Sequence, residues 1–162
     1  MRPKLKIKLD IYDKTLEILS FSAFIWLIWL VFRYYPELPE RIPSHFDIKG
    51  NADAFSSKSS IFILPVVGGV IYIGLLILNR FPHIFNYPKA ISPENALRQY
   101  TLATKLVRGL NFINITGFAF FTYYQILTAL GAVSGIPGTG IYLYLASIAG
   151  ILVMYIMKMT EK

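Results

Sequence analysis

The polar side chains best suited to chemistry gather in one short segment between two long apolar runs. His45, Asp47, Asn51 and Asp53 lie within nine residues and offer nitrogen and oxygen atoms of the kind that ligate divalent cations. Their spacing matches neither an EF-hand nor a zinc-binding helix motif. The alternatives are a turn closed by Asp and Asn hydrogen bonds with His45 packed on the loop, or His45 as a proton-sensitive contact for an external ligand.

A second polar group lies near the third of the long apolar runs. Asn111, Asn114, Thr122 and Gln125 fall on one helical face at about 100° per residue. Amides facing lipid are costly, so we expect this face to turn inward. It would serve either as a set of interhelical hydrogen bonds or as the polar lining of a small cavity or peptide groove.

The usual enzyme signatures are missing from the sequence. It contains no Gly-x-Ser-x-Gly elbow, no His-Glu-x-x-His, no P-loop and no dinucleotide glycine fingerprint. With no cysteine, disulfides, thiolate metal sites and cysteine nucleophiles are excluded. We therefore predict a protein that is not an enzyme, with no catalytic residue, cofactor or assigned metal; His45, Asp47 and Asp53 are the residues that would hold a metal if one bound.

The composition indicates a membrane protein. Of 162 residues, 55% are hydrophobic and 15% charged, and the mean hydropathy is +0.52, which does not fit a soluble core of this size. Uncharged or nearly uncharged stretches of membrane-spanning length occur at about 16–35, 59–79, 110–130 and 141–157. The predicted fold is an all-α, four-helix transmembrane bundle forming a single domain over 1–162, with a Pro-rich loop at 36–58 and a glycine-rich turn at 131–140.

The basic residues predict the orientation. The two tails and the connection at 80–109 together carry 12 Lys and Arg and five acidic residues, whereas the first connection, with its flanks, carries four of each and the third none. Positive connections stay in the cytoplasm, so both termini are expected inside and the loop with His45 outside. The net charge of +7 is then explained by anionic lipid headgroups and not by nucleic acid.

Two local patterns affect where the helices begin. Lys4, Lys6 and Lys8 precede the first apolar run as in a signal peptide, but the run is longer than a signal core and lacks small residues at a cleavage site, so we expect a retained helix. Within the connection at 80–109, Ser92-Pro93-Glu94 resembles a helix start. A helix beginning there would continue past Gly109 into the third membrane run.

The loop pattern resembles a known family. From Leu38 to Asp53 the chain reads Leu-Pro-x-x-Ile-Pro-x-His-Phe-x-x-x-Gly-x-x-Asp, which resembles the domain of unknown function 1648, over about residues 18–74. That domain forms the N-terminal part of the SdpI-like bacterial immunity membrane proteins. The resemblance implies a multi-pass protein of the bacterial cytoplasmic membrane and makes the loop the expected ligand-binding element. Its motif residues are Pro39, Pro43, His45, Asp47, Gly50 and Asp53.

Three functions fit these observations. The first is an immunity or sensor-type protein that binds an extracytoplasmic peptide or toxin through Leu38 to Asp53. The second is a structural or accessory subunit whose glycine-containing helices dock on a partner membrane protein. The third is a metal-dependent membrane enzyme using His45, Asp47 and Asp53.

Overall fold

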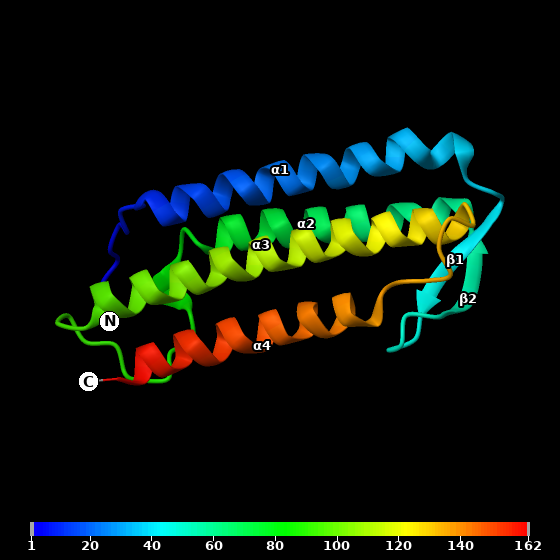
Figure 1. Cartoon of the computed structure of the whole chain (residues 1–162). Helices are drawn as coiled ribbons and strands as arrows, with labels where there is room; N and C mark the ends of the chain where they lie inside the picture. The colour runs from blue at the N-terminus through cyan, green and yellow to red at the C-terminus, as the bar shows by residue number, and fades with distance from the viewer. Residues whose placement is uncertain (1, 162) are drawn as a thin grey trace.

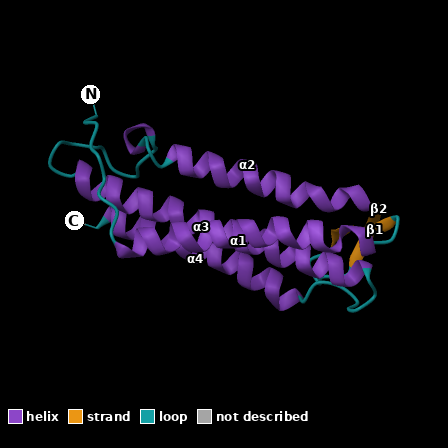
Figure 2. Cartoon of the chain, turned by 90° about the horizontal axis from the view of Figure 1, so that it is seen from above, coloured by secondary structure: helices purple, strands orange, loops and turns teal. Residues whose placement is uncertain are grey.

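A computed structural model describes residues 2–161 as a bundle of helices with a small hairpin at one end (Figure 1). The long helices are α1 (Ile11–Tyr34), α2 (Ile63–Leu78), α3 (Ala96–Ala129) and α4 (Gly138–Thr160). The strands are β1 (Arg41–Phe46) and β2 (Ala52–Ser57), and short 3-10 turns are η1 (Tyr35–Glu37), η2 (Lys58–Phe62) and η3 (Pro82–Ile84). Figures 1 and 2 place both termini at one end, here called the tail end, and the strands at the other, the hairpin end.

Three segments are long and apolar enough to cross a membrane: Ile11–Glu37, Lys58–Leu78 and Gly138–Thr160. The fourth crossing predicted at 110–130 is not confirmed, since α3 is not among them. The reason is the position of α3, which packs against α1, α2 and α4. A helix covered by neighbours does not need an apolar surface all round, and α3 carries most of the buried polar side chains in the described part of the chain.

The predicted all-α fold needs correction, because the Pro-rich loop at 36–58 contains an antiparallel hairpin. Arg41 pairs with Ser57 and Ile42 with Ser56, and the register shifts beyond Pro43. Proline has no backbone N–H to donate, so an irregular, two-stranded sheet accommodates it where a regular ladder would not. Between the strands Gly50 has φ +91°, which confirms the positive φ expected for this turn.

The start of α3 also differs from the prediction. The helix begins at Ala96, not at Ser92-Pro93-Glu94. The Asn95 side chain accepts from the Ser92 N–H at 3.0 Å and donates to the Ala90 carbonyl at 2.9 Å, which closes a separate turn before the helix. The predicted continuation is confirmed, because α3 passes Gly109 without a break and ends at Ala129.

The apolar core attaches the hairpin to the bundle. At the hairpin end, Ile42 of β1 is completely buried in a cluster with Leu30, Val31, Ile61 and Ile126. Because these residues come from α1, β1, η2 and α3, the hairpin is a part of the folded core and not an appendage.

Candidate functional site

The hairpin turn is closed by the Asp47 carboxylate. Its oxygens accept hydrogen bonds from the Lys49 N–H at 2.8 Å, the Asn51 N–H at 2.9 Å and the Asn51 side-chain amide at 3.0 Å. These bonds, led by the Asn51 amide, lower the pKa of Asp47 because they favour its charged form. Asp47 is therefore engaged in an Asx-type turn.

His45 and Asp53 meet across the two strands. The Nδ1 atom of His45 lies 2.5 Å from Oδ1 of Asp53, and both side chains are exposed, at 67% and 47%. The structure does not bring Asp47 into this pair: between residues 2 and 161 there is no group of three or more His, Cys, Asp or Glu side chains that could hold a metal ion. The three metal-ligand candidates are thus divided between a turn and an exposed pair.

The turn rests on the connection between α3 and α4. The Ile136 N–H donates to the Gly50 carbonyl at 2.9 Å, and Asn51 forms an isolated β-bridge with Gly135. A Cβ on Gly50 would lie 1.7 Å from the Ile136 oxygen, and one on Gly135 would lie 2.2 Å from the Gly50 oxygen. Glycine at both positions permits this backbone contact, which we call the glycine clasp (Gly50, Asn51, Gly135, Ile136).

The polar residues predicted on α3 reach three different neighbours. Asn111 donates to the Tyr72 carbonyl of α2 at 3.2 Å, and Asn114 accepts from the Tyr144 hydroxyl of α4 at 2.8 Å. Gln125 donates to the Pro43 carbonyl of β1 at 2.6 Å. The three amides therefore connect α3 to the elements around it.

Thr122 and Pro39 are placed differently from the other predicted site residues. Thr122 is fully buried, and its hydroxyl has no hydrogen-bond partner among the described residues. Pro39 is exposed between η1 and β1. Neither contributes a polar contact to the hairpin.

A small cavity lies under the hairpin. Its volume is about 130 Å³, and its polar lining consists of Ser44, Ser60 and Gln125. The Ser60 hydroxyl is buried without a partner. Such a space has room for a few water molecules at roughly 30 Å³ each, and is too small for a peptide groove.

Comparison with known proteins identifies the hairpin region. The family described as "Domain of unknown function (DUF1648)" matches residues 21–69, which comprise most of α1, the hairpin and the first turns of α2. Residues 21–69 are therefore similar to the DUF1648 family. The predicted resemblance is confirmed for this segment, and the described chain is mostly helical, with three segments long and apolar enough to cross a membrane.

A similar protein offers no role for comparison. An uncharacterized protein of Archaeoglobus fulgidus is 35% identical over 74 residues, which cover 41% of this chain and 39% of that relative. The match thus spans less than half of the relative's length. No solved structure matches the chain. The archaeal source gives no support to the predicted bacterial origin, and no comparison supports an immunity role.

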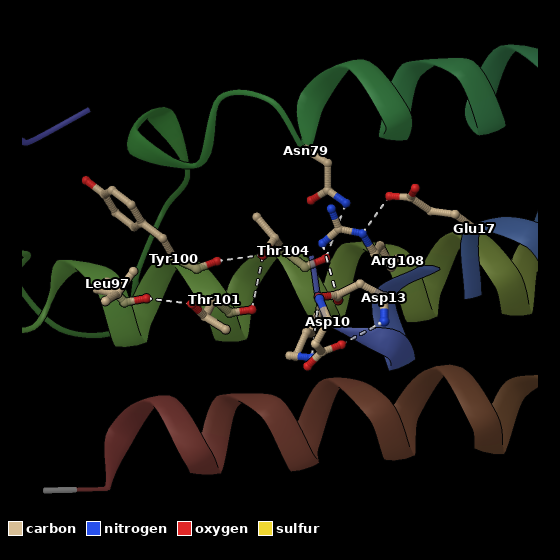
Figure 3. Close-up of polar contacts among 10 residues, drawn as sticks. Asp10, Asp13, Glu17, Asn79, Leu97, Tyr100, Thr101, Thr104 and Arg108 are labelled. Carbon is tan, nitrogen blue, oxygen red and sulfur yellow. Dashed lines mark hydrogen bonds and ion pairs between the residues drawn. The ribbon is translucent and has the colours of Figure 1, made fainter. Parts of the chain in front are cut away.

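A polar cluster that the sequence analysis missed lies at the tail end, outside the DUF1648 segment (Figure 3). Arg108 of α3 donates through Nε to Glu17 of α1 at 2.8 Å and lies 3.5 Å from Asp13. Lys105 lies 2.5 Å from Asp10 and 3.5 Å from Asp13. We call these five residues the ion-pair network; Asp13 and Arg108 are only 1% and 7% exposed.

A sequence signal for the ion-pair network existed. Asp10, Asp13 and Glu17 are spaced by three and four residues, and Lys105 and Arg108 by three, so each set occupies one helical face. The sequence analysis assigned all basic residues to contacts with lipid headgroups. It therefore missed that the acidic face and the basic face could pair with each other. In the structure the Lys105 ammonium lowers the pKa of Asp10 to about 2, chiefly through its hydrogen bond.

Proposed function

We propose that this protein is a multi-pass, non-enzymatic membrane protein that binds an extracytoplasmic peptide or toxin through the hairpin. The observation that carries the proposal is a strand edge, that of β2, which is exposed on an otherwise firmly held hairpin. An immunity or sensor role in the bacterial cytoplasmic membrane is the form of this function implied by the SdpI-like resemblance.

The hairpin is held at three points, which supports a preorganised binding element. Ile42 is buried in the core, Gln125 bonds to the buried Pro43 carbonyl, and the glycine clasp fixes the turn. A binding strand that is already fixed loses little conformational freedom when its ligand arrives. The hairpin therefore suits recognition better than a mobile loop would.

The free edge of β2 supports a peptide as the ligand. Across residues 2–161 the sheet has two strands, so β2 pairs with β1 on one side and with no other strand on the second. Residues 53–57 are all exposed. An edge of this kind presents unpaired N–H and C=O groups, to which an extended peptide adds as a further strand.

Exposed side chains on the hairpin could distinguish one peptide ligand from another. Phe55 is 52% exposed, and the His45–Asp53 pair lies next to it, since His45 is in register with Ala54. An apolar ring beside a polar pair would select a ligand segment that carries both kinds of side chain.

The binding experiment compares two phenylalanines at opposite ends of the molecule. Cells producing the wild type, Phe55→Ser or Phe81→Ser are challenged with a panel of membrane-active peptides, and survival and peptide crosslinking are measured. Phe55→Ser should lose protection and crosslinking, whereas Phe81→Ser, which removes a ring that is 44% exposed at the tail end, should retain both. Unchanged sensitivity of wild-type cells across the panel, with no crosslink, would overturn the proposal.

The orientation is a separate part of the proposal. The chain is naturally free of cysteine, so single cysteines at Ser44, Ser56, Ser92 and Ser134 are probed on whole cells with a membrane-impermeant thiol reagent. We expect labelling at the three hairpin-end sites and none at Ser92. Labelling at position 92 alone would show that the orientation is inverted. The hairpin would then lie in the cytoplasm and be a site for a cytoplasmic partner.

A second candidate function, an accessory subunit of a larger membrane complex, has its own supporting observation. A Cβ on Gly74 of α2 or on Gly150 of α4 would meet nothing within 4 Å, and α4 is mostly exposed along its length. Small residues on open helix faces permit close approach of a partner helix. Crosslinking and pull-down from native membrane test this, and recovery of the free protein alone would argue against it.

A further inference from the structure

The tail end contains a cavity that the proposed function does not use. Its volume is about 390 Å³, and it lies between the N-terminal segment, the end of α2 and the N-terminal half of α3. Its polar lining is Lys6, Asn79, Arg80, Thr104 and Arg108. We call it the tail-end cavity.

The charge of the tail-end cavity is positive. None of its lining residues is acidic. The charge of Arg108 is offset by Asp13 and Glu17 in the ion-pair network. In the part of the chain that the structure describes, neither Lys6 nor Arg80 lies within 4.0 Å of a carboxylate, so these two provide the uncompensated charge for an anion.

One buried acceptor in the cavity wall points to a second feature of the ligand. Asn79 donates through Nδ2 to the Thr104 carbonyl at 3.2 Å, and Figure 3 shows its amide facing the Arg108 guanidinium. The Asn79 Oδ1 atom is buried and accepts no hydrogen bond within residues 2–161. An unpaired buried acceptor is costly, and a ligand hydroxyl would satisfy it.

The position of the cavity indicates a lipid. The candidate membrane spans end at Leu78 and begin at Ile11, and the lining residues at 5–9 and 79–82 lie just beyond them. It therefore lies at the level of the headgroups. The remaining lining is apolar, namely Leu5, Ile7, Leu9 and Pro82. A free inorganic anion would gain nothing from this apolar wall, whereas the first methylene groups of a lipid's acyl chains would.

We propose that the tail-end cavity binds the headgroup of an anionic phospholipid, its phosphate held by Lys6 and Arg80 and a headgroup hydroxyl donating to Asn79. Basic pockets at the ends of membrane helices bind anionic headgroups by this combination of charge and shape. Because the cavity lies at the opposite end from the hairpin, this inference stands or falls independently of peptide binding.

The test is native mass spectrometry of the full chain purified in mild detergent. The protein is offered an equal mixture of phosphatidylglycerol and phosphatidylcholine with identical acyl chains. We expect preferential retention of phosphatidylglycerol, and a loss of roughly tenfold or more in that retention for Lys6→Gln/Arg80→Gln. The matched control, Lys4→Gln/Lys14→Gln, removes the same charge from exposed residues outside the cavity and should retain the lipid.

Three results would overturn the inference. Equal losses in both double variants would assign the lipid to diffuse surface charge. Displacement of phosphatidylglycerol by millimolar inorganic phosphate would identify a free-phosphate site. Equal retention of the two lipids by the wild type would exclude headgroup recognition, and this arm remains decisive even where Lys6→Gln/Arg80→Gln fails to fold.

Discussion

The two ends of the bundle are held together by different kinds of interaction. At the tail end, α1 is joined to α3 by the ion-pair network, in which Asp13 and Arg108 are buried. At the hairpin end, β1 and its turn are joined to the bundle by apolar packing, the Gln125 bond and the glycine clasp, with no buried ion pair among the described residues.

This difference matters because buried charges and neutral backbone contacts respond differently to change. A buried charge whose partner is removed keeps a large desolvation penalty. A neutral contact loses only its own hydrogen bond or its close fit. The tail end should therefore be the more sensitive to single substitutions, and the hairpin end the more sensitive to added volume.

The largest expected effect is at Arg108. Replacing it with Met removes the partner of the half-buried Glu17 and leaves the buried Asp13 with Lys105 alone. It should lower the free energy of unfolding by up to about 3–5 kcal/mol. The measurement is denaturant titration in detergent micelles. Lys14→Met, which removes an exposed charge one residue from Asp13, is the control and should change little.

A triple variant at the same site tests whether the ion pairs themselves or an unpaired buried charge determines stability. Asp13→Leu/Glu17→Met/Arg108→Met removes both signs together, and should recover most of the stability lost in Arg108→Met. If the triple variant is less stable than the single variant, the ion pairs themselves and not the unpaired charge determine stability at the tail end.

The next effect is expected at the glycine clasp. Gly50→Ala combines a positive φ with a clash against the Ile136 oxygen and should cost roughly 2–4 kcal/mol and release the Ile136 N–H to hydrogen exchange. Gly131→Ala is the matched control, because Gly131 has φ +72° but nothing within 4 Å of an added Cβ. It should cost only about 1 kcal/mol. Equal losses of stability in the two variants would mean that the positive φ, and not the contact with Ile136, causes the loss.

A smaller effect is expected from two buried polar residues that lie one turn apart on α3. Gln125→Leu leaves the buried Pro43 carbonyl without its donor and should cost about 1–3 kcal/mol. Thr122→Val removes a buried hydroxyl that has no partner within residues 2–161 and should be neutral or stabilising. Thermal unfolding of both variants checks this, and a destabilised Thr122→Val would indicate a bound water at that hydroxyl.

The smallest effect concerns pH and salt. The pKa of Asp10 is lowered from 3.8 to about 2 by Lys105, so the pair stabilises the fold above pH 3.8 and this contribution is lost as the pH falls through 2. Lys105→Gln should return the pKa of Asp10 toward 3.8 in a carboxyl NMR titration. Salt at about 0.5 M should also raise it.

Asp47 is the control for that titration. Its pKa is lowered by neutral amides, so salt should leave it nearly unchanged. If salt raised the pKa of Asp47 as much as the pKa of Asp10, the two carboxylates would not differ in how they are stabilised. The contrast between the tail end and the hairpin end would then fail.

Local features of the fold were predictable from the sequence. The motif from Leu38 to Asp53 indicated the family, and Gly50 between polar turn residues indicated a positive φ. The hairpin itself was not predicted, because prolines at 39 and 43 argue against a strand unless the strand tolerates irregular pairing. Asp47 was expected either as a ligand or as a turn residue, and the two uses have the same sequence signature.

The sequence by itself determined three apolar segments long enough to cross a membrane, the family likeness of residues 21–69 and the turn at Gly50, since each depends on the hydropathy or conformational preference of neighbouring residues. Only the tertiary structure decided the central position of α3, the pairing of Glu17 with Arg108 across 91 residues and the contact of Gly50 with Ile136. These contacts depend on which faces of distant segments meet, and the polar partners inside the bundle contribute to that choice.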